Sequence, residues 1–330
     1  MRVLARRALE QALSMPRCIE AMAQAMQAVS AGETDVPLRS HLPIRGTKGK
    51  LVVMPGSAPG LGVFGLKIVS KYPRPQGSAV GTHVGMVIVF DTNEGLPQAM
   101  MEGGTLTEIR TAAASALATK ALAREDAGVL AILGTGVQAE RHALAIPVVR
   151  PIRELRLWGR TAASAQALAE RLAPALDATI TVCGSAEHAV RGADIVCTTT
   201  SSSTPVLHGD WLSEGAHVNL VGAAVASSAE ADNRCLQRAR IYVDSRSAAA
   251  AEAGELRNAL AAGLIDDSAI IGEIGELLLG RIDGRMTPSD ITLYKSLGMA
   301  AQDLAAASAA LEGAKSLGLG FELDLAESSL

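Results

Sequence analysis

Apolar side chains recur at helical spacing near the N-terminus and then give way to short uninterrupted runs. Residues 17–31 (RCIEAMAQAMQAVSA) follow Pro16 and repeat apolar side chains at this spacing, which predicts an amphipathic helix opened by proline. The runs that come next are separated by glycine and proline and predict strands of an antiparallel sheet. These runs are residues 50–56, 62–70 and 83–91.

Small residues dominate the pattern from Thr105 onward. Thr105 and Glu108 have the spacing of a capping box, and the segment IRTAAASALATKALA predicts a long helix that can pack closely against its neighbours. The tail from residue 298 to 318 is again rich in alanine. We expect it to form a helix that returns to the first domain.

Strand and helix patterns alternate between about residues 128 and 245. This alternation is the sequence form of a doubly wound parallel sheet, an α/β architecture of the Rossmann type. Residues 161–172 and 185–191 are among its predicted helices. The candidate strands are GVLAILG (128–134), LRLWG (155–159), ATITV (178–182), ADIVCTT (193–199), AHVNLVG (216–222) and RIYVD (240–244).

The first of these strands leads into a glycine-rich turn. Residues 134–139 (GTGVQA) fit the pattern GxGxx(G/A), directly after an apolar strand and at the start of a helix. In such a turn Gly134 makes the tight bend, and Gly136 lets the backbone approach a pyrophosphate, which binds the free amides of the helix. We therefore expect a dinucleotide here, against the alternative of an ordinary strand-to-helix turn.

The end of the second strand indicates which dinucleotide to expect. An NAD site carries an acidic residue there, ~20 residues after the glycines, for the ribose 2′-hydroxyl. This chain has WGRT at 158–161, and Glu154 lies at the wrong end of the strand. The planar guanidinium of Arg160 suits a 2′-phosphate, which predicts NADPH as the preferred cofactor and NADH as the alternative. The competing interpretation is that Arg160 is a solvated residue at a helix start.

Three cationic side chains stand among apolar or small residues. Arg39 lies in VPLRSHLPI, Lys67 in VFGLKIVSK and Arg110 in TEIRTAAASA. An unpaired buried charge is costly, so each needs an anion nearby. A substrate carboxylate is one candidate, and a structural Asp or Glu is the other. The residues alone leave both open.

Length and composition restrict the class of protein. A chain of 330 residues is long enough for two domains, and a hydrophobic fraction of 48% with a net charge of −4 gives no basic footprint for nucleic acid or an anionic membrane. No apolar stretch reaches membrane-spanning length, and no histidine or acidic spacing suggests a metal. Four cysteines without CxxC spacing favour reduced thiols and a cytoplasmic location. They are Cys18, Cys183, Cys197 and Cys235.

Taken together, eight ordered segments resemble the ornithine cyclodeaminase and mu-crystallin family, which includes ketimine reductases and an alanine dehydrogenase branch. The resemblance covers nearly the whole chain. The segments are VPLRSHLPI, GLKIVSKYP, LTEIRTAAASALATKAL, LGTGVQAERHA, LWGRT, CTTTSSSTPVL, VNLVGA and KSLGMAAQDLAAA.

The resemblance implies a discontinuous organisation, with a substrate and dimerisation domain at 1–120 plus 298–330, a dinucleotide domain at 121–297, and a homodimer. It places Arg39, Lys67 and Arg110 at substrate-carboxylate and catalytic positions, with Thr82 as a further site residue. It also favours the NADPH-using branch. The cofactor-binding positions are Gly134, Thr135, Gly136, Val137, Gln138, Arg160, Thr161, Thr199, Val221, Gly222, Ala223 and Ser296.

One departure from the family changes the expected reaction. Cyclodeaminases carry an aspartate where this chain has Ala224, and neither Glu230 nor Asp232 fills the gap convincingly, which puts cyclisation of ornithine in doubt. A reductase needs only a hydride donor and a protonated imine nitrogen. We therefore expect reduction of a cyclic imino acid, Δ1-pyrroline-2-carboxylate or Δ1-piperideine-2-carboxylate, to L-proline or L-pipecolate.

In this expected reaction Arg39 and Arg110 clamp the carboxylate of the substrate. Lys67 completes the site as the catalytic proton donor, with its pKa lowered by the two guanidinium groups. The alternatives are an alanine-dehydrogenase-like enzyme, an ornithine cyclodeaminase, and a non-catalytic protein that binds NADPH and a ligand.

Overall fold

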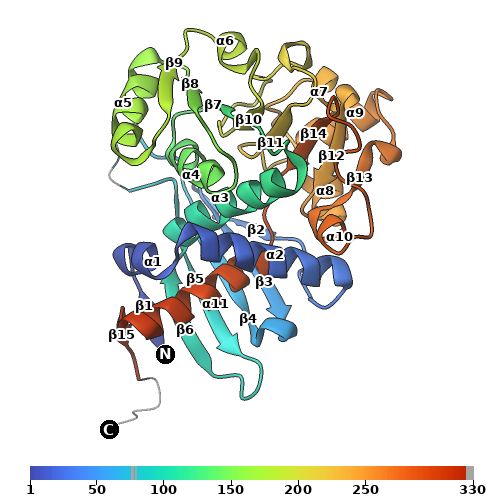
Figure 1. The fold of residues 1–330 in the computed structure, drawn as a ribbon. Coiled ribbons are helices and arrows are strands. Elements are labelled where there is room, and N and C mark those ends of the chain that lie inside the picture. Colours follow the sequence, from blue (N-terminus) through green and yellow to red (C-terminus); the bar gives the residue numbers. More distant parts are fainter. Residues whose placement is uncertain (76–77, 79, 325–330) are drawn as a thin grey trace. The chain divides into compact units, whose positions relative to one another are not determined.

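The chain folds into two compact units. In this computed structural model, which describes residues 1–75, 78 and 80–324, unit 1 comprises Met1–Arg110 and Met299–Leu330, and unit 2 comprises Thr111–Gly298 (Figure 1). The chain leaves unit 1 within helix α3 (Gly103–Leu122) and returns to it just before helix α11 (Ala300–Leu317). Each unit is described separately below.

The described part of unit 1 forms a seven-stranded sheet in the order β15-β1-β6-β5-β4-β3-β2. Neighbouring strands are antiparallel except β1 and β6, which confirms the antiparallel sheet expected from the three apolar runs. The strands are β1 (Arg2–Leu4), β2 (Ser40–Pro43), β3 (Lys50–Ala58), β4 (Val63–Lys71), β5 (His83–Asp91), β6 (Pro97–Glu102) and β15 (Phe321–Glu322).

Helices cover one face of this sheet. Helix α11 packs against α1 (Arg6–Ala12) and α2 (Met15–Ala31) and across β3, β4 and β5 (Figure 1). Small residues allow this close packing, since a Cβ atom on Gly313 would lie only 2.1 Å from the carbonyl oxygen of Ala12. The expected N-terminal helix is confirmed, with proline in its first turn and Gly32 in the left-handed conformation (φ 76°) after its last residue.

The expected capping box at the start of α3 is wrong. The helix begins at Gly103, two residues before the predicted cap. The carboxylate of Glu102 accepts hydrogen bonds from the amides of Gly104 and Thr105, at 2.7 Å each. Thr105 therefore lies inside the first turn, where its side chain does not act as a cap.

Unit 2 confirms the doubly wound parallel sheet. Residues 111–298, all described, contain an eight-stranded sheet in the order β13-β12-β14-β11-β10-β7-β8-β9, parallel at every pairing. All six predicted strands are present, whereas β13 and β14 were not predicted. The strands are β7 (Val129–Leu133), β8 (Glu154–Trp158), β9 (Thr179–Val182), β10 (Ile195–Thr198), β11 (His217–Leu220), β12 (Ala239–Val243), β13 (Ile270–Glu273) and β14 (Ile291–Lys295).

Helices connect these strands and close the core of unit 2. Thr161 caps α5 and Ser185 caps α6, each through a side chain that accepts a backbone N–H, so both predicted helices are confirmed. The helices are α4 (Val137–Ala145), α5 (Ala162–Leu172), α6 (Ala186–Val190), α7 (Asn233–Arg238), α8 (Arg246–Glu252), α9 (Gly254–Ala261) and α10 (Ile274–Leu278).

Three further observations concern membrane-spanning helices, metal sites and the state of the cysteines. No helix among the described residues is long and apolar enough to cross a membrane. The described residues also contain no group of three or more His, Cys, Asp or Glu side chains placed to hold a metal ion. Each of the four cysteines is a buried free thiol.

Candidate active site

Two of the three predicted cations of unit 1 meet at one carboxylate. Lys67 comes from β4 and Arg110 from α3, and both are buried. The Nζ atom of Lys67 lies 2.7 Å from Oδ2 of Asp303, and Nε of Arg110 donates to Oδ1 at 2.9 Å. A second nitrogen of Arg110, Nη1, donates to Oε1 of Gln302 at 3.1 Å. The sequence did not assign this partner, although Asp303 is an acid in the buried, alanine-rich first half of helix α11.

Burial and charge set the proton affinities of this cluster. The pKa of Lys67 is lowered to about 8: burial is the largest cause, Asp303 opposes it, and the charges of Arg110 and Arg39 act with it. The expected direction is therefore confirmed, but the main cause is desolvation and not the guanidinium groups. Burial raises the pKa of Asp303, but Lys67 and Arg110 more than offset this effect and hold it below its usual range. One carboxylate faces two cations, so the cluster keeps an excess positive charge.

The third cation lies beside this cluster. Because Ser40 of β2 pairs with Val53, Arg39 falls next to Met54, and Met54 pairs with Lys67. Arg39 is half-buried, and its charge is one of those that lower the pKa of Lys67. The structure thus groups Arg39 with Lys67 in unit 1, as the resemblance implies.

Thr82 immediately precedes β5 and is exposed. Its hydroxyl is 2.9 Å from Nδ1 of His83. The pKa of His83 is lowered to about 4, chiefly by burial and in addition by the charges of Lys71, Lys50 and Lys67. This histidine is therefore neutral at physiological pH, and the surroundings of Thr82 are strongly cationic.

The glycine-rich turn of unit 2 has the geometry of a phosphate loop. Gly134 adopts φ 131°, and a Cβ atom there would lie 2.5 Å from Oγ1 of Thr199, so only glycine fits without strain. Gly136 precedes the first residue of α4, and a Cβ atom on it would meet open space. The turn is therefore tight at Gly134 and unobstructed at Gly136, where the free amides of α4 begin.

The basic position after β8 is open to solvent. Arg160 is exposed and makes no hydrogen bond or ion pair with another residue that the structure describes. The next residue, Thr161, is occupied as the cap of α5, its hydroxyl accepting from the amide of Ser164 at 3.3 Å. Arg160 is thus available to bind an anion beside the glycine-rich turn, while Thr161 has a structural role.

The other predicted cofactor positions follow three parallel strands. Thr199 follows β10, residues 221–223 follow β11, and Ser296 follows β14. Ligands bind at the carboxyl ends of such strands, which is where these residues gather. Residues 137 and 138 begin α4, with Val137 exposed. Thr135 packs against Gly159, whose added Cβ atom would lie 2.4 Å from the Thr135 methyl group.

Glu230 has a role that the sequence did not indicate. It is fully buried, and its carboxylate accepts hydrogen bonds from the loops that follow β10 and β11. The expectation that it does not supply the acid missing at Ala224 agrees with this placement, because its oxygens are turned toward loop backbone.

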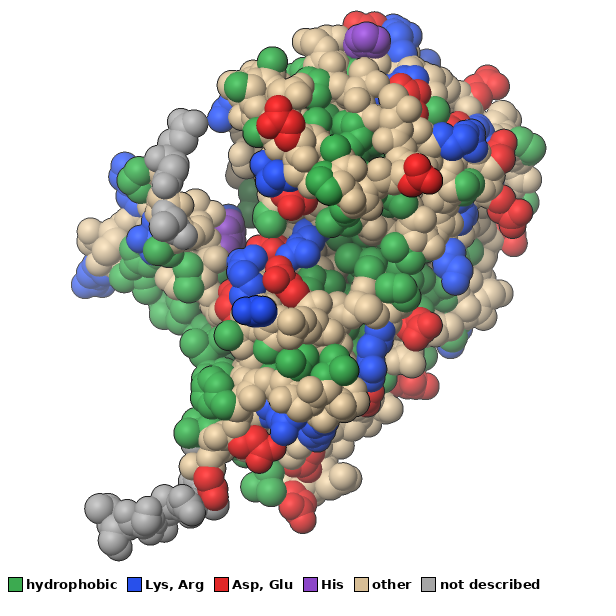
Figure 2. Space-filling model, turned by 60° about the vertical axis from the view of Figure 1, so that its left-hand side comes forward, with side chains coloured by type: hydrophobic (Ala, Val, Ile, Leu, Met, Phe, Trp, Pro, Cys, Tyr) green, Lys and Arg blue, Asp and Glu red, His purple; other side chains and the backbone are tan. Residues whose placement is uncertain are grey.

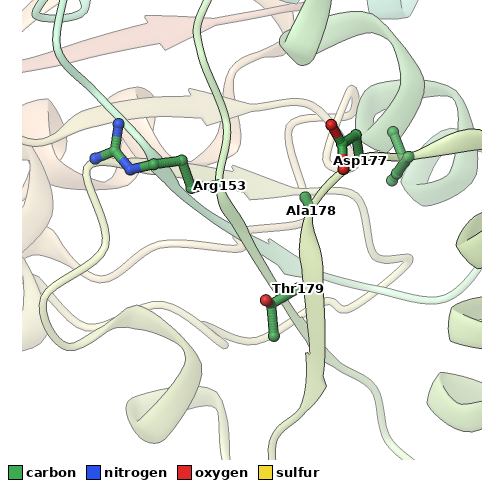
Figure 3. A pocket seen from close by; sticks show the side chains of 5 residues that line it. Arg153, Asp177, Ala178 and Thr179 are labelled. Atoms are coloured by element: carbon green, nitrogen blue, oxygen red, sulfur yellow. The ribbon is translucent and has the colours of Figure 1, made fainter.

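A surface hollow lies elsewhere in unit 2. Arg153, Asp177, Ala178 and Thr179 line it together with Leu176, at the amino-terminal ends of β8 and β9 (Figure 3). Ligands of parallel sheets bind at the opposite, carboxyl-terminal ends. We therefore assign no functional role to this hollow.

These features define a class of protein: a Rossmann-fold dinucleotide enzyme with a second unit that carries a buried cationic cluster suited to a small acid. The chain belongs to the ornithine cyclodeaminase/mu-crystallin family, whose family model matches residues 1–317. The family expected from the sequence is thus confirmed.

Relatives of known activity support this membership. The Delta(1)-pyrroline-2-carboxylate reductase of Bacillus cereus is 37% identical over 313 residues, which is 94% of this chain and 96% of the relative. The ketimine reductase mu-crystallin of Mus musculus is 37% identical over 271 residues, 82% of each protein. The structure of Thermococcus litoralis Delta(1)-pyrroline-2-carboxylate reductase in complex with NADH and L-proline matches with a TM-score of 0.94 and 32% identity, over 98% of this chain and 100% of that chain.

Proposed function

We infer that this protein is a nicotinamide-dependent reductase that converts a cyclic imino acid, Δ1-pyrroline-2-carboxylate and/or Δ1-piperideine-2-carboxylate, to L-proline or L-pipecolate. The observation that carries this proposal is the buried cluster of Lys67, Arg110 and Asp303 in unit 1. It supplies a carboxylate-binding cation and an acid of suitable pKa in one place. The named activities of the relatives point the same way.

In this proposal the two arginines hold the substrate carboxylate. Asp303 and Gln302 already bind Nε and Nη1 of Arg110, so these contacts fix its guanidinium plane and leave Nη2 for the substrate. Arg39 supplies the second cation. Because the cluster has more positive than negative charge, an incoming carboxylate neutralises it.

Lys67 is the proposed proton donor to the imine nitrogen. A pKa of about 8 keeps its ammonium group mostly protonated at neutral pH and makes proton transfer easier than from an ordinary lysine. Asp303 holds the Nζ atom at 2.7 Å and so orients it. Hydride is supplied by the reduced nicotinamide ring when the cofactor is bound.

The residues of unit 2 fit a dinucleotide. The space beside Gly136 and the free amides of α4 would receive the pyrophosphate, and the exposed guanidinium of Arg160 would receive a 2′-phosphate. We accordingly propose NADPH as the preferred cofactor, with NADH as the alternative.

In the same proposal residues 121–297 form the dinucleotide domain, and residues 1–120 with 298–330 form the substrate and dimerisation domain.

We also propose a homodimer formed through the outer face of the unit 1 sheet. One face of this sheet lies under α11, whereas the other carries apolar side chains, among them Val84 (46% exposed) and Met86 (40% exposed). Figure 2 shows hydrophobic side chains gathered on the left-hand side of the view. Phe64 and Phe90 stack on this outer face with ring centroids 5.2 Å apart. An exposed apolar face of this kind is suited to a second copy of the chain.

The proposed location is the cytoplasm, in keeping with four free thiols.

The test of the function is a spectrophotometric assay with the purified protein. We expect NADPH to be consumed with Δ1-pyrroline-2-carboxylate or Δ1-piperideine-2-carboxylate, and L-proline or L-pipecolate to accumulate in equal amount. Consumption with pyruvate and ammonia, and not with either imine, would identify an amino acid dehydrogenase. Formation of proline from ornithine with catalytic NAD would identify a cyclodeaminase, and binding of NADPH without turnover would contradict the enzymatic proposal.

A further inference from the structure

The carboxylate of Glu230 is enclosed by hydrogen-bond donors from two loops. The residue is fully buried, in unit 2, far along the chain from most of the groups it contacts. Oε1 accepts from the amide and the hydroxyl of Thr200, at 2.6 and 2.7 Å. Oε2 accepts from the Thr198 hydroxyl at 2.9 Å and from the amides of Gly222 and Ala223 at 2.6 and 3.1 Å.

These donors belong to the loops that carry proposed cofactor positions. Thr198 is the last residue of β10, Thr199 and Thr200 follow it, and Gly222 and Ala223 follow β11. The two loops come close together, because a Cβ atom on Gly222 would lie 2.0 Å from the carbonyl oxygen of Thr200. The carboxylate therefore holds two cofactor loops at a fixed separation.

The backbone of Glu230 is also fixed. Its carbonyl oxygen accepts from the amides of Val206 and Leu207, and its own amide donates to Oε1 of Glu255 at 3.0 Å. Glu255 in turn pairs with Lys295, the last residue of β14, at 3.1 Å. Lys295 also donates to the carbonyl oxygen of Ala223. A third strand end, which carries Ser296, is thereby connected to the same loop.

We propose that Glu230 is a positioning residue for the dinucleotide: through its hydrogen bonds it fixes the loops after β10 and β11 in the conformation that receives the cofactor. The inference rests on the proposed nicotinamide site, and it assigns no contact between Glu230 and the substrate. Preorganised loops bind without an ordering cost at the moment of association. Loss of this arrangement should therefore appear first in cofactor affinity.

Only a carboxylate satisfies all five donors. Glutamine has one acceptor oxygen, so its NH₂ group must face either the Thr200 amide or the amides of Gly222 and Ala223. In the first orientation the NH₂ group opposes one backbone N–H and in the second it opposes two, because the threonine hydroxyls can turn to accept, and each opposed N–H pushes a loop away. The isosteric Glu230→Gln change thus tests the hydrogen-bonding role with almost no change in volume.

The experiment measures NADPH and NADH binding by fluorescence titration, together with steady-state kinetics and thermal unfolding. We expect Glu230→Gln to raise the Kd of both cofactors about tenfold or more, since charge-assisted hydrogen bonds are lost, and to leave the KM for the imine nearly unchanged. A variant with a lowered Tm but wild-type cofactor Kd and kcat would overturn the proposal.

A milder variant covers the case in which Glu230→Gln does not fold. Thr200→Val removes one donor to the carboxylate, and we expect it to raise the cofactor Kd a few-fold. Thr119→Val is the matched control, because Thr119 is a buried threonine of unit 2 that accepts from Asn219 at 3.0 Å and makes no contact with Glu230. It should lower the Tm and leave the cofactor Kd unchanged. Equal Kd effects from Thr200→Val and Thr119→Val would also overturn the proposal.

The titration separates this inference from the proposed reaction. If the wild-type protein binds NADPH but reduces neither imine, the proposed substrate is wrong, and the effect of Glu230→Gln on Kd still tests the positioning role. If the wild-type protein reduces the imine and Glu230→Gln binds cofactor normally, the positioning role alone is wrong.

Discussion

Lys67 combines features that rarely occur together in a lysine. It is buried in a strand, has a single carboxylate partner and shares that partner with a guanidinium group. Desolvation favours its neutral form, and Asp303 favours its charged form. The balance leaves the ammonium group acidic enough to act as a proton donor at neutral pH.

Replacing Lys67 should therefore change the rate more than substrate binding. We expect Lys67→Met to lower kcat by about 10²-fold or more, the usual contribution of a positioned acid. In the wild type the rate should fall as the pH rises through about 8, where Lys67 loses its proton, and this limb should be absent in the variant.

Stopped-flow and steady-state kinetics measure both effects. They are recorded over roughly pH 6 to 10, a range that brackets the pKa of Lys67. Lys48→Met, which removes an exposed lysine of the same unit, is the control and should behave as the wild type. A preserved kcat with a raised KM in Lys67→Met would make this lysine a binding residue only.

In the proposed function, cofactor preference depends on Arg160. We expect Arg160→Ala to raise the KM for NADPH by about tenfold or more and to change the KM for NADH little, because only NADPH carries the 2′-phosphate. Arg171→Ala, an arginine of α5 that pairs with Glu140 at 3.0 Å, is the matched control. Equal changes for both cofactors would contradict a phosphate contact at Arg160.

The sequence predicted isolated residues of the site better than their partners. Lys67 and Arg110 were found because a cation in an apolar segment is locally unusual. Asp303 and Glu230 were not assigned because their partners lie far away in sequence and, for Glu230, are largely backbone amides. Such contacts are created by the fold and leave no pattern in a single sequence.

At the scale of elements, a strand was predicted where it formed an apolar run between glycines and prolines or alternated with helix patterns. Strands β3, β4 and β5 and six strands of unit 2 were found in this way. Strands β1, β2, β6, β13 and β15 were not predicted, and neither was β14, whose pattern includes the buried Lys295. The start of α3 was placed wrongly because an acidic cap from the preceding strand competes with a threonine cap.

Helix α11 depends on small residues where it crosses α1. We expect Gly313→Ala to lower the free energy of unfolding by about 1–3 kcal/mol, because the new methyl group overlaps a backbone oxygen that cannot move easily. Thermal and denaturant unfolding measure this change. Ser308→Ala alters a half-buried residue of the same helix and should be close to neutral. An unchanged stability in Gly313→Ala would mean that α1 and α11 pack less tightly than described.

At the scale of the whole molecule, the apolar outer face of the unit 1 sheet predicts self-association. A twofold interface contains each substituted residue twice, so one buried charge per chain is costly. We expect Met86→Glu to convert a dimer to a monomer, measured by sedimentation equilibrium or light scattering. Met286→Glu, at an exposed methionine of unit 2, is the matched control. A monomeric wild type, or a dimer that survives Met86→Glu, would contradict the proposed interface.

Unit 1 is built from two segments that are far apart in the sequence, and this has a consequence for biosynthesis. Arg110 leaves the ribosome 193 residues before Asp303, and Lys67 leaves it earlier still. Until helix α11 docks, these two cations have no carboxylate between them, and burying them together is unfavourable. The cluster of Lys67, Arg110 and Asp303 therefore forms only when synthesis has passed Asp303, so nascent chains and prematurely terminated products lack it, even those that contain the whole of unit 2.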